Sequence, residues 1–126
     1  MKIEHLALNV PDSAAMADWY VEHLAFRIVK AGTSAPFVRF IADTEGCMLE
    51  LYSNDSAPIF NYQHVHHLSL HLAFEVDHPD VIKERLEAAG ASFVEKIETA
   101  DGDTLIMMKD PWNISIQLCK RAERMI

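Results

Sequence analysis

The stretch HLALNV at residues 5–10 returns as HLAFEV at residues 71–76, a shift of 66 residues from His5 to His71. Two further segments repeat with a shift of 67 residues: AFRIVK (25–30) as SFVEKI (92–97), and LELYS (49–53) as IQLCK (116–120). One extra residue near the second predicted helix accounts for the difference. Similarity at a fixed period indicates that one supersecondary unit occurs twice in the chain.

Both halves carry the same order of predicted elements: strand, helix, strand, strand, strand. Helices are expected near 13–24, where Asp12 or Ser13 can cap the first turn, and near 79–89, between Pro79 and Gly90. Alternating apolar residues and intervening turns predict strands at 2–10, 26–31, 37–42, 47–53, 67–76, 91–97, 104–109 and 114–120. We expect an α+β fold in which 1–126 is a single domain: two βαβββ modules (1–53 and 67–120) with a connector (54–66), forming a curved mixed sheet around a cleft.

Composition excludes several classes of protein. With 126 residues, half of them hydrophobic, the chain can bury one compact core. The net charge is −8 and the eleven basic residues are scattered, which argues against a nucleic-acid partner. No apolar run approaches the roughly 20 residues that span a bilayer, and the start lacks signal-peptide features, so we expect no membrane partner and a cytoplasmic location. The two cysteines are then expected to be free thiols.

The repeat pairs His5 with His71, and Glu50 with Gln117. If each helix covers one face of its sheet, these four residues belong to the open faces and could converge. Two imidazoles and a carboxylate can form the first shell of a divalent metal, with Gln117 as a neutral oxygen donor or an outer partner. The alternative is that both histidines are ordinary structural residues, since a single strand histidine usually is.

Histidines crowd the segment HVHHLSLHLAF, residues 64–74. His71 matches His5 in the repeat, which indicates that it is the functional residue of the group. Strand alternation places His67 on the same face as His71, opposite a Leu and Phe face that would pack on the helix. The other three histidines, at 64, 66 and 67, are interpreted as solvated connector residues, and a separate metal site of their own is the alternative.

Three motifs resemble the vicinal oxygen chelate superfamily, which contains glyoxalases, bleomycin-resistance proteins and dioxygenases. They are IEHLALNVPDSAAMADWYVEHLAF (3–26), LHLAFEVDHPDVIKERLEAAGASF (70–93) and KDPWNISIQL (109–118). The resemblance covers nearly the whole chain. It implies that metal ligands come from the first and last strands of each module, which here are His5, Glu50, His71 and Gln117. It also implies a divalent ion (Ni, Co, Mn, Zn or Fe), a small-molecule substrate and a homodimer.

Departures from the family pattern refine the expected function. Gln117 replaces a Glu that is a base in isomerase members, which leaves Glu50 as the expected catalytic residue. Asn9 and His67 stand where glutathione-binding members carry Arg, while Asn54 matches a glutathione contact; these three are the expected substrate-binding residues. The resemblance implies a metal-dependent, glyoxalase-like lyase or isomerase related to lactoylglutathione lyase. The alternatives are a non-catalytic bleomycin-resistance-type binding protein and an extradiol-type dioxygenase.

Overall fold

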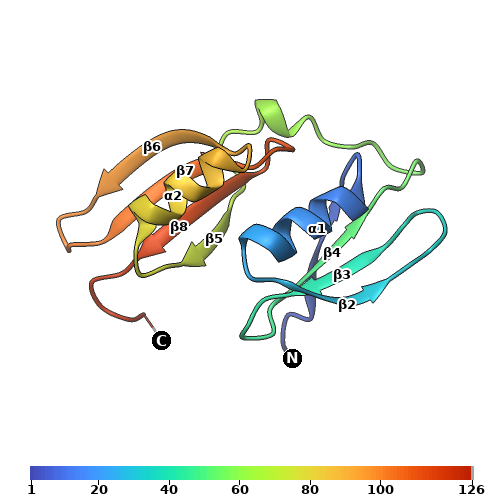
Figure 1. Ribbon diagram of the computed structural model, residues 1–126, viewed down its shortest axis with the longest axis horizontal. Helices are drawn as coiled ribbons and strands as arrows, with labels where there is room; N and C mark the ends of the chain where they lie inside the picture. Colours follow the sequence, from blue (N-terminus) through green and yellow to red (C-terminus); the bar gives the residue numbers. More distant parts are fainter. Residues whose placement is uncertain (126) are drawn as a thin grey trace. The chain divides into compact units, whose positions relative to one another are not determined.

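A computed structural model describes residues 1–125 of the chain and divides it into two compact units, Met1–Phe60 and Asn61–Ile126. Within the described residues each unit contains one α-helix and one four-stranded sheet (Figure 1). This confirms the expected α+β class and the two βαβββ modules. No described helix has the length and hydropathy needed to span a membrane.

The elements of the two units follow each other in the same order. In the first unit they are β1 (His5–Asn9), α1 (Ser13–His23), β2 (Arg27–Ala31), β3 (Arg39–Ala42) and β4 (Met48–Tyr52). In the second unit the short 3₁₀ helix η1 (Tyr62–His64) precedes β5 (Leu72–Glu75), α2 (Pro79–Ala88), β6 (Ser92–Glu98), β7 (Thr104–Lys109) and β8 (Ser115–Lys120). The predicted helices and most predicted strands are confirmed to within two or three residues.

The two sheets share one topology and one register. The strand orders are β1-β4-β3-β2 and β5-β8-β7-β6, with the first and last strands of each unit paired in parallel. Ala7 lies opposite Glu50 in the first sheet, and Ala73 lies opposite Gln117 in the second. These positions are equivalent in the sequence repeat, so the repeat extends to the individual ladder partners.

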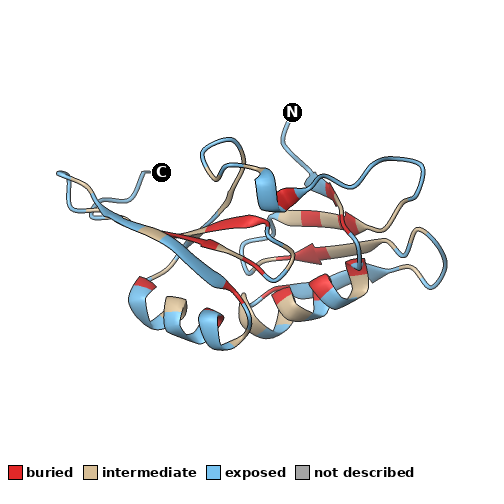
Figure 2. Ribbon diagram, turned by 90° about the horizontal axis from the view of Figure 1, so that it is seen from above, coloured by how far each residue is buried: buried red, intermediate tan, exposed pale blue. Residues whose placement is uncertain are grey.

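Strand alternation separates a helix face from an open face in each sheet. Leu49 and Leu51 are buried on the helix side of β4, whereas Glu50 between them is half-buried. Ile116 and Leu118 are fully buried on β8, whereas Gln117 between them is half-buried. Figure 2 shows buried residues on the central strands of each sheet and on α1. The polar residues of the repeat therefore lie on the face away from the helix.

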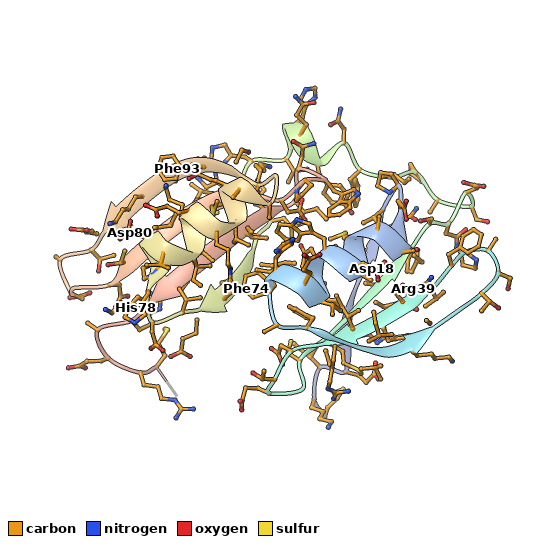
Figure 3. All side chains as sticks on the ribbon, viewed as in Figure 1. Asp18, Arg39, Phe74, His78, Asp80 and Phe93 are labelled. Carbon is orange, nitrogen blue, oxygen red and sulfur yellow. The ribbon has the colours of Figure 1, made fainter. Side chains whose placement is uncertain are left out.

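Local sequence explains where the helices begin and end. Asp12 caps α1 by accepting a hydrogen bond from the Ala15 amide at 2.9 Å. Pro79 occupies the first turn of α2, beside His78 and Asp80 (Figure 3), and Gly90 follows its end with φ +97°. The buried side of α1 consists of Ser13, Met16, Ala17 and Tyr20. Ala14, Val21 and Leu24 of the same segment are only partly buried.

The strand expected over residues 67–76 is wrong at its beginning. Residues 67–69 form a turn in which the Ser69 amide donates to the His66 carbonyl at 2.8 Å, and β5 starts only at Leu72. Leu68, expected on the helix side, is 76% exposed. Alternation of apolar residues alone cannot distinguish a strand from a turn whose backbone groups are satisfied locally, so the pattern overextended the strand.

Candidate functional site

The first unit brings His5 and Glu50 together on the open face of its sheet. His5 begins β1, and Glu50 lies in the middle of β4, the parallel neighbour of β1. His5 Nε2 lies 3.2 Å from Glu50 Oε2, and the two side chains are 33% and 22% exposed. The His5 ring also meets the edge of Phe40 on β3, with ring centroids 5.5 Å apart. The sheet thus holds an imidazole against a carboxylate and beside one aromatic ring.

Two carboxylates act on the His5 ring. The Glu4 side chain bonds to Nδ1, while Glu50 approaches Nε2. The hydrogen bond to Glu4 raises the pKa of His5 most, the charges of both glutamates raise it further, and partial burial opposes them. Because a carboxylate oxygen only accepts hydrogen bonds, Nδ1 of His5 is the donor in its bond to Glu4. Sequence analysis missed Glu4; its position next to His5 was the only available signal.

The second unit holds His71 and Gln117 in separate polar settings. His71 directly precedes β5, and its Nδ1 donates to the His67 carbonyl at 2.8 Å. Since a carbonyl can only accept, Nδ1 carries a proton, and in the neutral form of the ring the lone pair then lies on Nε2. Gln117 Oε1 accepts from the Cys119 thiol at 2.9 Å. This bond uses one acceptor position of the amide oxygen and leaves the amide NH₂ group as a donor.

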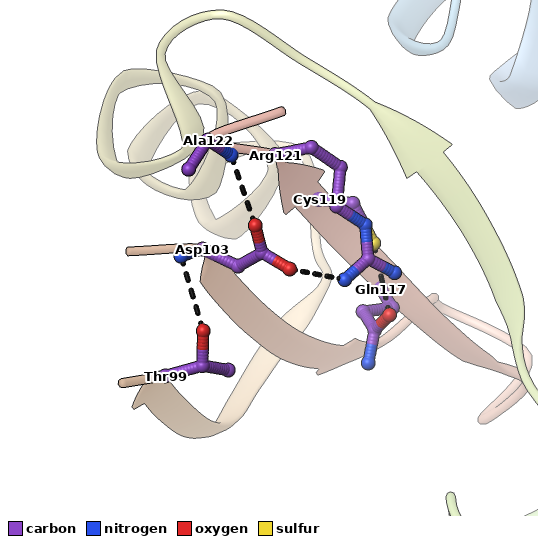
Figure 4. A network of polar contacts seen from close by, with 6 residues as sticks. All are labelled: Thr99, Asp103, Gln117, Cys119, Arg121 and Ala122. Atoms are coloured by element: carbon purple, nitrogen blue, oxygen red, sulfur yellow. Dashed lines mark hydrogen bonds and ion pairs between the residues drawn. The ribbon is translucent and has the colours of Figure 1, made fainter. Parts of the chain in front are cut away.

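Gln117, Cys119 and Arg121 follow one another on the open face of β8 and beyond its end (Figure 4). Burial raises the pKa of the Cys119 thiol, so the thiol stays protonated and can donate to Gln117. Arg121 Nη1 donates to Asp103 Oδ2 at 2.5 Å. The second oxygen of Asp103 accepts from the Ala122 amide at 2.9 Å, and this bond together with Arg121 lowers the pKa of Asp103. Both cysteines are free thiols, as the sequence predicts.

Asn9 and Asn54, two of the expected substrate-binding residues, bond to each other's chain segments. Asn9 Nδ2 donates to the carbonyls of Asn54 and Ala57, both at 3.0 Å, and Asn9 Oδ1 accepts from the Asn54 amide at 2.9 Å. Asn54 Oδ1 accepts from the Ser56 amide at 2.9 Å. These bonds attach the segment after β4 to the end of β1.

His67, the third expected substrate-binding residue, is paired with Glu95 of β6. The two atoms His67 Nε2 and Glu95 Oε1 lie 2.7 Å apart, and the His67 side chain is 13% exposed. The neighbouring His66 ring stacks on His67 with centroids 4.2 Å apart, and its Nδ1 accepts from the Leu68 amide at 3.2 Å. The sequence offered no signal for Glu95, because only the folded sheet brings β6 beside the turn at 67–69.

The candidate metal-ligating side chains are divided between the two units. Within each unit, no three described His, Cys, Asp or Glu side chains gather at one point. Each unit carries two residues of the expected set: His5 beside Glu50 in the first, and His71 and Gln117, in separate settings, in the second. A ring whose Nδ1–H is held by a carboxylate or a carbonyl is the usual arrangement of a ligating histidine, and both His5 and His71 have it.

Comparison with known proteins agrees with this architecture. The family model described as Glyoxalase/Bleomycin resistance protein/Dioxygenase superfamily matches residues 2–118. A glyoxylase/bleomycin resistance protein/dioxygenase domain from Frankia sp. EAN1pec is 25% identical, with a TM-score of 0.76 over 98% of this chain and 93% of that chain.

Two other solved structures share the fold at lower identity. TnmS3, an antibiotic binding protein from Streptomyces sp. CB03234, is 20% identical, with a TM-score of 0.70 over 97% of each chain. A possible glyoxalase from Bacillus cereus is 19% identical, with a TM-score of 0.69 over 94% of this chain and 97% of that chain. No curated protein sequence matches. Because the family model spans nearly its whole length, the chain belongs to the Glyoxalase/Bleomycin resistance protein/Dioxygenase superfamily.

Proposed function

We propose that the protein is a metal-dependent, glyoxalase-like lyase or isomerase that acts on a small substrate with adjacent oxygens. The observation that carries this proposal is the pair formed by His5 Nε2 and Glu50 Oε2, 3.2 Å apart on the open face of the first sheet. The pair unites a nitrogen ligand with a carboxylate that can hold a cation or move a proton. Family membership supports a small-molecule site on this fold.

The donor side chains of each unit are of types that bind divalent cations. A cation would replace the proton on His5 Nε2, where the two carboxylates already favour positive charge. His71 would contribute its Nε2 lone pair, and Gln117 would be the weakest ligand because its amide oxygen is neutral and already accepts a hydrogen bond from Cys119. With one carboxylate and two neutral imidazoles the set carries a charge of about −1, so a divalent ion leaves net positive charge. Nickel, cobalt, manganese, zinc and iron are all compatible with such ligands.

Proton transfer falls to Glu50 in this proposal. The bound ion would supply Lewis acidity toward the substrate carbonyl. Glu50 would take the proton from the neighbouring carbon and return it at the adjacent position, which is the step that distinguishes an isomerase or lyase from a binding protein. Gln117 has no basic group, so its NH₂ donor serves to orient a substrate oxygen. Asn9, Asn54 and His67 remain proposed substrate contacts.

Calorimetric metal titration of tag-free protein tests the proposal. We expect Ni²⁺, Co²⁺, Mn²⁺ or Zn²⁺ to bind the wild type, Glu50→Gln to weaken binding about 10- to 100-fold, and Gln117→Glu to tighten it. Glu45→Gln, in the exposed turn before β4, is the matched control and should bind like the wild type. Solvent-deuterium incorporation into a panel of hydroxyketones then tests Glu50 as a base. Negligible metal binding by every variant would contradict the proposal.

A binding protein without catalysis is the second candidate. It is supported by the similarity to TnmS3, an antibiotic binding protein of the same fold. An exposed aromatic side chain, Phe60, is 68% accessible and could stack on a flat ligand, whereas Tyr62 is buried at 5% and could not. Tight binding of flat aromatic antibiotics by metal-free protein, without deuterium exchange in any hydroxyketone, would favour this candidate.

We also propose a homodimer, as its family resemblance implies. The outer strands β2 and β6 expose apolar side chains, including Ile28, Val29 and Ile97, that a second copy could cover. Light scattering should report twice the chain mass of 14.3 kDa at micromolar concentration. A monomer mass throughout that range would contradict it.

A further inference from the structure

The segment of residues 61–71, which we call the histidine segment, is fastened to the second sheet at two points. Lys109, at the end of β7, donates through Nζ to the carbonyls of Tyr62 at 3.0 Å and Val65 at 2.8 Å. After Val65 the segment passes through the turn at 67–69 and ends at His71, directly before β5. Lys109 therefore holds the backbone of the first half of the segment, and this attachment does not involve the segment's side chains.

Glu95 fastens the second half through a side chain. The pair formed by His67 Nε2 and Glu95 Oε1 spans 2.7 Å and is mostly shielded on the histidine side, where His67 is 13% exposed. Glu95 lies opposite Met107 on β7, and Met107 lies opposite Gln117 on β8. Residues opposite one another in a ladder share a face, so Glu95 brings His67 to the open face that carries Gln117.

The backbone of His67 in turn controls the ring of His71. The His67 carbonyl accepts the Nδ1 proton of His71 at 2.8 Å, across the turn of 67–69. If His67 moved, its carbonyl would move with it, and His71 would lose the partner that selects its tautomer. Neutral imidazole in water favours the other tautomer, with the proton on Nε2, so the Nδ1–H form needs a fixed acceptor.

We propose that Glu95 is a positioning residue: by holding His67 it fixes the carbonyl that keeps His71 in the Nδ1–H tautomer with a free lone pair on Nε2. This lone pair is the group through which His71 binds a cation or accepts a proton. The role of His71 in chemistry rests on the proposed function, whereas its tautomer does not. His67 is then the residue that links Glu95 to His71.

Long-range ¹H–¹⁵N NMR of the metal-free protein at about pH 8 reads directly which ring nitrogen of His71 carries the proton. We expect a protonated Nδ1 and an unprotonated Nε2 for His71 in the wild type. Glu95→Ala should shift the His71 nitrogens toward the opposite tautomer, and Glu95→Gln, which keeps an oxygen acceptor, should shift them less. Glu98→Ala, on the same strand and paired with Lys96 at 3.4 Å, should change nothing.

Amide spectra of each variant verify that the fold is intact, and Glu95→Gln remains informative if Glu95→Ala unfolds. A wild-type His71 with its proton on Nε2, or an unchanged tautomer in folded Glu95→Ala, would overturn the inference. Titration with Ni²⁺ separates it from the proposed function. If no metal binds while the tautomer shifts as expected, the positioning role stands and the metal proposal fails; if metal binds, Glu95→Ala should weaken it about 10- to 100-fold.

Discussion

Replacing Ala25 by glycine should stabilise the protein, and the structure allows the size of the effect to be worked out. Ala25 follows Leu24, the C-cap of α1, with φ +57°, and Gly90 follows Ala89, the C-cap of α2, with φ +97°. The two positions are equivalent helix ends, and only the second carries the residue that the left-handed backbone favours. Ala25 is exposed, so removing its methyl group forfeits little burial.

The magnitude follows from two opposing terms. A residue with a Cβ atom pays about 1–2 kcal/mol in the left-handed region. Glycine loses about 0.5–1 kcal/mol more conformational entropy on folding. Ala25→Gly should therefore raise the free energy of unfolding by about 0.5–1 kcal/mol, or Tm by about 2–4 °C in a chain of 126 residues. Gly90→Ala should lower it by at least as much, since an added Cβ would meet Pro111 Cγ only at an ordinary 3.6 Å and the cost comes from the backbone.

Urea unfolding followed by circular dichroism measures both variants against the wild type. Asn113→Gly is a useful third variant because Asn113 has φ +67°, and asparagine tolerates this region better than alanine, so its gain should be smaller. The reasoning is refuted if Ala25→Gly leaves the free energy of unfolding unchanged or lowers it while Gly90→Ala is destabilising as expected.

Two further outcomes concern the network at the end of β8. The hydrogen bond from the Ala122 amide, and then Arg121, lower the pKa of Asp103, so the ionised carboxylate stabilises the fold above its ordinary pKa of 3.8 and this stabilisation is lost as the pH falls below it. The Tm difference between wild type and Asp103→Asn should therefore shrink from pH 7 to pH 3. A constant difference would contradict this. Cys119→Ala removes the donor to Gln117 Oε1, so NMR order parameters of the Gln117 NH₂ group should fall, whereas Cys119→Ser, which keeps a donor, should preserve them.

The architecture could be predicted because it depends on local and periodic features. The repeat of residues 5–10 at 71–76, the cap at Asp12 and the turn residue Gly90 indicated two βαβββ modules, and the structure confirms them. Alternation along β4 and β8 also indicated correctly that Glu50 and Gln117 lie away from the helices. Binary pattern and turn chemistry act over a few residues, so a single sequence contains them.

The same periodic reasoning failed where backbone amides find hydrogen-bond acceptors within a local turn. Residues 67–69 alternate like a strand but form a turn, because the Ser69 and Leu68 amides find acceptors in His66. Such local bonds compete with a sheet ladder, and a hydrophobic pattern does not register them. The interpretation of His67 as a strand residue was wrong for this reason.

The amino-acid sequence by itself determined the module order, the faces of the sheets and the equivalence of His5 and His71 in the repeat. Only the tertiary structure decided what each of these histidines touches: Glu4 and Glu50 around His5, and the His67 carbonyl at His71. Strand register brings Glu50 beside His5, and the turn at 67–69 brings the His67 carbonyl to His71. Neither contact follows from the alternation of residues along a strand. Hydrogen-bond donors and acceptors select a tautomer only at about 3 Å, a distance that no periodicity encodes.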